Sequence, residues 1–191
     1  GTVIKTQTMY YDRISNEAYY KTGGTISDGK SVTYSKSGTY DLTTRTINLN
    51  QGVKIEDREY TLEGPNLVQN QNTNIVDISG YTVITNKKNP KNRIITDKGT
   101  YNLNTKEAFL TKNSKIFYND KILTGDELYF NQITGFGKGT GNVTLDDPVE
   151  KRYIKGGYGE IYEKKDSAMI TKSPYAVKIL EKDSIYFAAE K

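Results

Sequence analysis

The sequence contains no cysteine and no histidine among its 191 residues. Without cysteine the chain can form no disulfide and offers no thiolate to a metal ion. Without histidine it lacks the side chain that most often transfers protons near neutral pH. These two absences exclude a Ser-His-Asp triad, a Cys-His pair and a His-ligated zinc site within the chain. Tryptophan is also absent and only 35% of the residues are hydrophobic, so we expect a thin core.

Long apolar runs and concentrated charge are missing as well. No hydrophobic run approaches the ~18 residues that a membrane-spanning helix needs. The net charge of +4 comes from 27 basic and 23 acidic residues that are interspersed along the chain. Nucleic-acid-binding proteins usually concentrate lysine and arginine into one stripe. The scattered charge favours an ordinary solvated surface over a polyanion-binding patch, and we expect no nucleic-acid partner.

What the sequence does contain is tyrosine, at 16 residues, together with many short segments of alternating polarity. In "GVKIEDREYTLEG" the apolar residues Val53 and Ile55 alternate with charged ones, and Asp57-Arg58 is predicted to form a turn. "SKIFYNDKILTG" repeats this plan around a predicted turn at Asn119-Asp120. Such a period of two is typical of half-buried antiparallel strands. No helical periodicity competes with it, so we predict an all-β chain.

One phrase occurs twice. "GTYDLTTRTINL" begins at Gly38 and "GTYNLNTKEAFL" begins at Gly99. With weaker copies, the chain divides into six strand-turn-strand units of ~30 residues, and a repeat of that length indicates a stacked array. The third copy, "LVQNQNTNIVDI" near residue 69, is irregular. A loop is predicted at residues 85–92, where asparagine, lysine and proline cluster.

Two motifs that suggest catalysis or nucleotide binding fail on geometry. In "GFGKGTG", residues 135–141, the spacing of a dinucleotide-binding loop is broken, and no helix pattern follows, so we predict a bulge or tight bend. Three acidic pairs, at residues 56–57, 126–127 and 146–147, are predicted to serve turns and the surface. Neighbouring carboxylates on a strand face opposite ways and do not form the facing pair of a glycosidase. We therefore expect no catalytic residues, no metal and no cofactor.

The alternating apolar residues form the remaining candidate site. They fit the core of a closed sandwich, and they also fit an open groove that binds an apolar ligand, because both use the same residue types. The residues predicted to line such a groove are Val53, Ile55, Leu62, Ile116, Ile122, Leu128, Phe130, Val143, Leu145, Ile170, Val177 and Ile179.

Two phrases in the second half of the chain carry a family resemblance. Residues 125–130 read "GDELYF" and residues 141–145 read "GNVTL". With the segments around them, these phrases resemble the OstA-like (organic solvent tolerance) family of lipopolysaccharide-transport proteins, which includes LptA, LptC and the N-terminal domain of LptD. The resemblance covers most of the chain and is strongest over residues 94–180.

The resemblance implies a fold and a function. The fold would be an open antiparallel β-jellyroll, or β-taco, forming a single domain over residues 1–191 that is either complete or a piece of a longer chain. Its apolar groove would bind the acyl chains of lipid A, and lysine and arginine at the rim would meet lipid phosphates. Edge strands would stack on other lipopolysaccharide-transport proteins, or on further copies of this chain, to bridge the periplasm. No signal peptide is visible before Gly1, and we expect one to have been removed.

The rival interpretation is a surface β-solenoid that binds polysaccharide, or an adhesin-like structural repeat. Tyrosine-rich strands suit the stacking of sugar rings, and a repeat of this length suits a solenoid. A parallel solenoid and an open V-shaped array differ in cross-section and in strand direction, so the fold discriminates between them.

Overall fold

The computed structural model describes residues 1–188 as one 19-stranded sheet with a short 3-10 helix. In chain order the elements are β1 (Val3–Thr6), β2 (Tyr10–Asp12), β3 (Glu17–Tyr20), β4 (Gly24–Ser27), β5 (Val32–Ser35), β6 (Ser37–Asp41), β7 (Thr46–Glu56), β8 (Tyr60–Asn70), β9 (Ile75–Asn86), β10 (Arg93–Asn102), β11 (Glu107–Lys112), β12 (Lys115–Tyr118), β13 (Lys121–Thr124), β14 (Glu127–Asn131), β15 (Phe136–Asp147), β16 (Arg152–Tyr162), η1 (Glu163–Lys165), β17 (Ser167–Thr171), β18 (Tyr175–Ile179) and β19 (Ser184–Ala188). All strand pairs within this range are antiparallel. The all-β prediction is confirmed, and the parallel solenoid is wrong.

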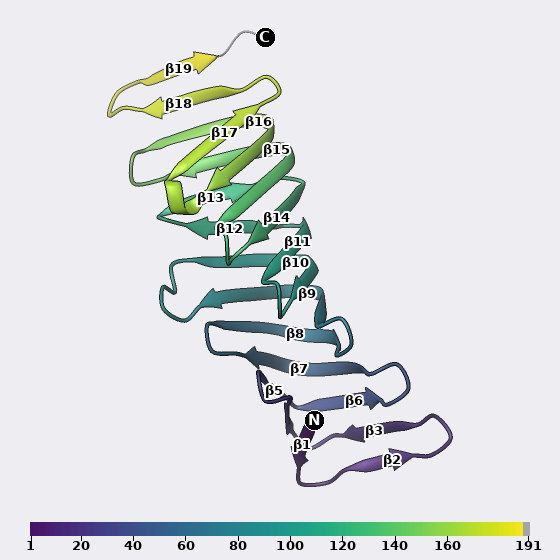
Figure 1. The fold of residues 1–191 in the computed structure, drawn as a ribbon. Helices are drawn as coiled ribbons and strands as arrows, with labels where there is room; N and C mark the ends of the chain where they lie inside the picture. Colours follow the sequence, from purple (N-terminus) through teal and green to yellow (C-terminus); the bar gives the residue numbers. More distant parts are fainter. Residues whose placement is uncertain (189–191) are drawn as a thin grey trace.

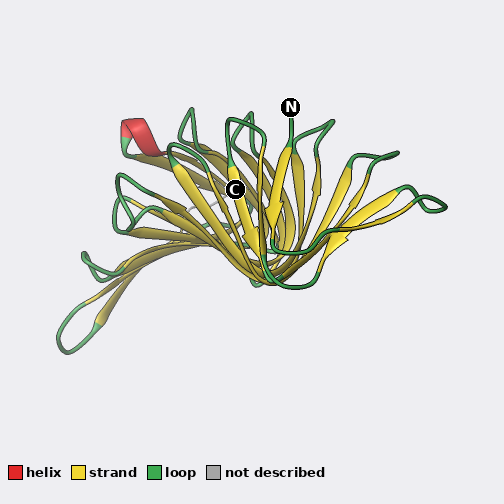
Figure 2. Cartoon of the chain, turned by 90° about the horizontal axis from the view of Figure 1, so that it is seen from below, coloured by secondary structure: helices red, strands yellow, loops and turns green. Residues whose placement is uncertain are grey.

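The sheet is folded lengthwise into two walls, and its strands stack as rungs from the N-terminal to the C-terminal end (Figure 1). The first wall contains β2, β3, β6, β11, β14 and β17, and the second contains β1, β4, β5, β12, β13, β18 and β19. The six long strands β7, β8, β9, β10, β15 and β16 cross from one wall to the other. Seen along the stack, the strands descend from one row of turns to a crease and rise to a second row (Figure 2). This V-shaped section agrees with the predicted open β-jellyroll.

At the crease the long strands bend through bulges. The register of β15 shifts between Thr140 and Val143, and the two residues between them have positive φ. An extra residue in one strand bends it and increases its twist. Small polar side chains occupy the inside of the crease, where the Thr96 and Ser114 hydroxyls lie 2.8 Å apart in a hydrogen bond. We infer that small residues are required here because the two walls converge.

The turns of the first wall share one hydrogen-bond pattern. An Asp or Asn side-chain oxygen accepts from the backbone N–H groups two and three residues later, in turns that begin at Asp12, Asp41, Asn70, Asn102 and Asn131. The last residue of each has a positive φ: Asn16, Arg45, Asn74, Lys106 and Gly135. A sixth turn uses η1 instead. The predicted six units are confirmed. The third is regular, because its Asn70 turn matches the others.

The turns of the second wall also follow the prediction closely. Asp57 accepts 2.7 Å hydrogen bonds from the N–H groups of Glu59 and Tyr60, which closes the β7–β8 turn. Asn119 and Asp120 both have positive φ and form a two-residue turn between β12 and β13. The loop predicted at residues 85–92 is shorter, since β9 continues to Asn86.

Among the residues that the structure describes, the stack ends in strands with one unpaired edge. β1 and β2 have such edges at the N-terminal end, and β17 and β19 have them at the C-terminal end. Within residues 1–188, no helix is long and apolar enough to cross a membrane.

Candidate functional site

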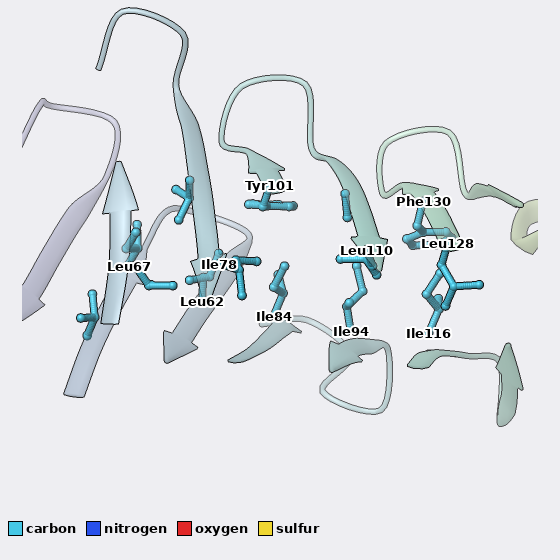
Figure 3. Packing of buried hydrophobic residues seen from close by; sticks show 14 of the residues in the cluster. Leu62, Leu67, Ile78, Ile84, Ile94, Tyr101, Leu110, Ile116, Leu128 and Phe130 are labelled. Carbon is cyan, nitrogen blue, oxygen red and sulfur yellow. The ribbon is translucent and has the colours of Figure 1, made fainter. Parts of the chain in front are cut away.

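The two walls enclose a continuous apolar interior. On the second wall, consecutive strands place their inward side chains opposite one another in a single row: Ile55, Leu62, Ile84, Ile94, Ile116, Leu123, Leu145 and Ile154. Side chains of the first wall, including Leu67, Ile78 and Leu110, pack against this row (Figure 3). Cross-strand pairs of this kind are the basic stabilising unit of a sheet. The interior is therefore one apolar trough that follows the long axis of the stack.

The middle of the trough is filled by its own side chains. Ile84, Ile116 and Val143 are 0% exposed. Glycines in the "GFGKGTG" segment make room for large neighbours, since a Cβ atom at Gly137 would lie 2.8 Å from Ile161 and 2.9 Å from Phe130. The predicted bulge is present at the end of this segment. Over its middle the trough is thus a packed core.

Nine of the twelve predicted lining residues face the interior. Eight of them are buried: Val53, Ile55, Leu62, Ile116, Leu128, Phe130, Val143 and Leu145. The ninth, Ile170, is partly buried and packs against them. Whether any of these residues contacts a lipid stays a prediction.

The side chains of the other three, Ile122, Val177 and Ile179, are directed to the outer face, which corrects their predicted orientation; Val177 is nevertheless among the residues that line the C-terminal cavity. Ile122 pairs with Phe117 because the two-residue turn at Asn119-Asp120 sets the register, and its neighbour Leu123 takes the inward place. A shift of one residue moves a whole strand to the opposite face.

The same reasoning applies to β18. Val177 pairs with Tyr153 and Tyr186 on the outer face, where these rings flank it, and it is 2% exposed. Ile179 shares that face and is 46% exposed. The inward residue of β18 is Ala176, which pairs with Ile154 of the trough row.

A cavity of about 480 Å³ opens at the C-terminal end of the trough. Its apolar lining includes Leu145, Ile154, Ala168, Ala176 and Phe187. Ala176 pairs with Ile154 on one side and with Phe187 on the other, so the cavity continues the second-wall row. Phe187 lies on the edge strand β19 and is 59% exposed. The trough is therefore filled in the middle and open at this end.

Basic side chains surround the cavity. Lys121, Arg152 and Lys178 line it together with Asp147 and Asp166. Asp147 Oδ2 accepts hydrogen bonds of 3.2 and 3.1 Å from Arg152 Nε and Nη2. Burial acts to raise the pKa of Asp147, but the Glu150 N–H and Arg152 outweigh it and the pKa lies below its ordinary value. The rim therefore carries three cations against two carboxylates, a set that sequence alone did not bring together.

Across the mouth of the V, side chains of the two walls meet along a line that we call the seam, formed by Lys106–Asp57, Asn92–Glu163 and Lys121–Asp166. Asn92 Nδ2 donates a 2.7 Å hydrogen bond to Glu163 Oε1, and Lys121 Nζ lies 2.7 Å from Asp166 Oδ1. Beneath the seam, a small cavity of about 50 Å³ lies between Tyr60, Tyr118 and Phe130. The mouth is thus bridged by polar contacts above an apolar interior.

Two of the seam carboxylates, Asp57 and Glu163, have opposite pKa shifts. Burial acts to raise the pKa of Asp57, but Lys106 and the N–H groups of the Asp57 turn outweigh it, so the pKa lies below its ordinary value. Burial raises the pKa of Glu163, which Lys164 opposes only in part. No sequence signal indicated these pairs, because the partners are far apart in the chain.

The acidic pairs occupy structural positions. Asp57 and Asp147 accept backbone hydrogen bonds in their turns, and Asp126 accepts from the Asn142 side chain at 2.9 Å. Within the described residues, no group of three or more acidic side chains could hold a metal ion.

The comparison with protein families agrees with the resemblance seen in the sequence. The family model described as OstA-like protein matches residues 1–65. The matched segment is the N-terminal third of the chain. No curated protein matches the sequence. OstA-like proteins are connected with lipopolysaccharide or lipid transport and are generally not enzymes.

The OstA-like match lies toward the N-terminus, whereas the phrases that carry the resemblance in the sequence lie within residues 94–180. The architecture joins the two regions, because the Asp41 turn inside the matched segment has the same hydrogen bonds as the Asn102 turn outside it. The OstA-like segment is therefore the first part of a stack built on one plan.

Proposed function

We propose that this chain binds lipopolysaccharide, with the acyl chains of lipid A entering the C-terminal cavity and lying against its apolar lining. The observation that carries the proposal is the continuity of the apolar row from the packed interior to Ala176 and Phe187 in an open cavity. The OstA-like match at the other end of the chain supports the same ligand class. The apolar row and the OstA-like match both support a transport role without catalysis.

The cavity has a size and polarity that suit an acyl chain. Its volume of about 480 Å³ falls inside the ~300–1,000 Å³ range of ordinary ligand pockets. Each buried methylene group contributes about 0.8 kcal/mol, so a single acyl chain gains several kcal/mol without any polar contact. Binding of this kind needs no specific hydrogen-bond pattern, and a lipid can move along the lining.

The rim of the cavity supplies the headgroup contacts. Lys121, Arg152 and Lys178 line the place where the phosphates of lipid A would lie if its acyl chains occupied the floor. Arginine binds phosphate in a bidentate manner, and lysine acts as a point charge. A phosphate would compete with Asp147 for Arg152 and with Asp166 for Lys121.

The unpaired edges at the two ends of the stack would pair with other proteins. Exposed edge strands are usually protected, because they add a further strand readily. Here β17 and β19 at one end, and β1 and β2 at the other, would join neighbouring lipopolysaccharide-transport proteins or further copies of this chain. Such a head-to-tail contact need not close into a ring. We place this bridge in the periplasm.

Polysaccharide binding is the second candidate, and one observation favours it. On the outer face of the first wall, the rings of Phe109 and Tyr129 lie 4.9 Å apart, and those of Phe136 and Tyr162 lie 5.4 Å apart. Exposed aromatic rings can stack on sugars. Lipid binding is preferred because this aromatic row belongs to neither the trough nor the cavity.

Lipid binding is tested with two variants of the same strand. Ala176→Glu places a charge in the cavity, and Ile179→Glu places the same charge on the outer face. We expect at least a tenfold loss of lipopolysaccharide affinity for Ala176→Glu, little change for Ile179→Glu, and no binding of de-acylated lipopolysaccharide to the unmodified chain. Equal binding of acylated and de-acylated forms would overturn the proposal, and glycan binding that is independent of acylation would favour the second candidate.

A further inference from the structure

The seam and the crease hold the two walls together in different ways. At the crease, the walls are joined by the backbone of the six long strands and by their ladders. At the seam the walls are joined through side chains: Lys106 with Asp57, Asn92 and Asn119 with Glu163, and Lys121 with Asp166. Among residues 1–188, no backbone-to-backbone hydrogen bond crosses the mouth. Parting the walls at the seam therefore leaves every strand pair intact.

The crease has the properties of a hinge. Its bulges and positive-φ residues, such as those at Gln51-Gly52 and Gly141-Asn142, interrupt the ladders between the walls. Small residues face each other inside it, so little side-chain volume must be displaced when the angle changes. Hinges are commonly a few positions that absorb backbone rotation while packed elements move as units.

The last contact of the seam adjoins the open cavity. Lys121 and Asp166 bridge the mouth and also line the cavity. The next contact inward, between Asn92 and Glu163, covers the small void beside Tyr118 and Phe130. The seam thus runs from the open end of the trough over its packed interior.

We propose that the seam is a lateral gate: the walls part along the mouth, hinged at the crease, starting from the Lys121–Asp166 pair beside the cavity. The gate exposes the trough from the side and lets a long apolar chain enter without threading through the end. Its use in loading acyl chains rests on the proposed function, whereas the opening motion itself belongs to the free protein. The motion is therefore tested without any lipid.

The chain has no cysteine, so a single introduced thiol reports on its own position. Ala108 is 0% exposed and pairs with Phe130, which lines the void under the seam. Ser114 is 5% exposed and lies at the crease, where its hydroxyl bonds to Thr96. Ala108→Cys therefore samples opening of the gate, and Ser114→Cys, a nearly isosteric change, samples the hinge side.

The experiment measures the labelling rate of each thiol by a maleimide in native buffer and at low urea concentrations. Local opening exposes little surface and depends weakly on urea, whereas global unfolding depends strongly on it. We expect the labelling rate of Ala108→Cys to be nearly independent of urea, because local opening exposes the thiol. We expect the labelling rate of Ser114→Cys to rise steeply with urea, because only global unfolding exposes that thiol. Adding Asn92→Ala, which removes the donor to the Glu163 carboxylate, should speed labelling of Ala108→Cys about tenfold more than it speeds labelling of Ser114→Cys.

A control separates the gate from general loosening. Lys91→Ala removes an ion pair with Asp120 that joins two turns of the same wall, and it should leave the ratio of the two labelling rates unchanged. The proposal of a gate is overturned if the labelling rates of both thiols depend on urea in the same way. It is also overturned if Asn92→Ala and Lys91→Ala change the ratio of the two labelling rates equally. A gate that opens in a protein that binds no lipopolysaccharide would leave this inference standing and overturn the proposed function alone.

Discussion

The hydroxyl of Tyr101, near the end of β10, donates a 2.6 Å hydrogen bond to Oε1 of Gln132. Gln132 lies in the next turn of the first wall, between β14 and β15. The first copy of the repeated phrase makes the same bond, from Tyr40 to Gln71 at 2.8 Å. Tyr101 is 1% exposed, and burial raises its pKa above the ordinary tyrosine value. Each copy of the phrase thus supplies a tyrosine that ties its rung to the following turn.

Removing this hydroxyl should be more costly at Tyr101 than at Tyr40. We expect Tyr101→Phe to lower the free energy of unfolding by about 0.5–1.5 kcal/mol, the usual contribution of a hydrogen bond. Tyr40→Phe should cost less, because Tyr40 is only half-buried and water can replace the bond. Urea denaturation of the two variants checks this. Equal effects at the two sites would show that burial does not set the contribution.

The Lys106–Asp57 pair should stabilise the chain more than an exposed ion pair. Its side chains are 12% and 14% exposed, whereas those of Lys91 and Asp120 are 75% and 53% exposed. We expect Lys106→Met to cost about 1.5–3 kcal/mol, as for a hydrogen bond to a charged group. Lys91→Met should cost about 0–1 kcal/mol. Thermal or urea unfolding measures both, and a larger loss for Lys91→Met would contradict the account.

Two of the seam carboxylates, Glu163 and Asp57, should affect stability with opposite dependence on pH. The pKa of Glu163 is raised by burial, so its contribution to stability is present at acid pH and is lost as the pH rises through the folded-state pKa. Glu163→Gln should therefore gain stability relative to the unmodified chain as the pH rises above the ordinary glutamate pKa near 4.3. The midpoint of urea unfolding at several pH values measures this difference.

Asp57 gives the opposite sign. Its folded-state pKa is lowered, so its contribution is present above the ordinary aspartate pKa of about 3.9 and is lost as the pH falls. Asp57→Asn should consequently lose most stability near neutral pH and least in acid. A pH-independent difference for both variants would mean that neither charge acts at the seam.

The glycine of the repeated phrase should not tolerate a side chain. A Cβ atom at Gly99 would overlap the backbone carbonyl oxygen of Phe109 and lie 3.1 Å from Leu110 Cα. Backbone cannot move aside as a flexible side chain can, so Gly99→Ala should cost about 1–3 kcal/mol or more. The neighbouring outward change Thr100→Ala should cost at most about 1 kcal/mol. Comparable losses for the two variants in urea denaturation would contradict this packing.

Local features of the fold could be predicted from the sequence. The first-wall turns follow an Asp or Asn whose side chain bonds to nearby N–H groups, and residues that accept positive φ follow at a fixed offset. Both signals are local, so the residues of the turn from Asn102 to Lys106 carry them within the repeated phrase itself. The turn at Asn70 has the same chemistry and was obscured only because asparagine and glutamine surround it.

The faces of the strands and the seam could not be predicted in the same way. Ile122 was assigned to the interior because it is apolar, yet the turn at Asn119-Asp120 decides its register. The residues that bridge the mouth, such as Lys106 and Asp57, are far apart in the chain and meet only because the folded sheet brings the two walls together. Apolar pattern alone also could not separate the filled middle of the trough from its open C-terminal end.

The claim that lipid lies on the inward face of the open end can be tested at two adjacent aromatic residues. Phe187 faces the cavity and pairs with Ala176, and Tyr186 faces outward and pairs with Val177. Both are well exposed, at 59% and 72%. Their similar exposure makes each a control for the other.

The measurement replaces each residue in turn by the photo-reactive amino acid benzoylphenylalanine, adds lipopolysaccharide and compares the yield of crosslinked product after irradiation. The account predicts strong crosslinking at position 187, little at position 186, and loss of the product when de-acylated lipopolysaccharide is used. Equal crosslinking at the two positions, or crosslinking at position 186 alone, would contradict the account.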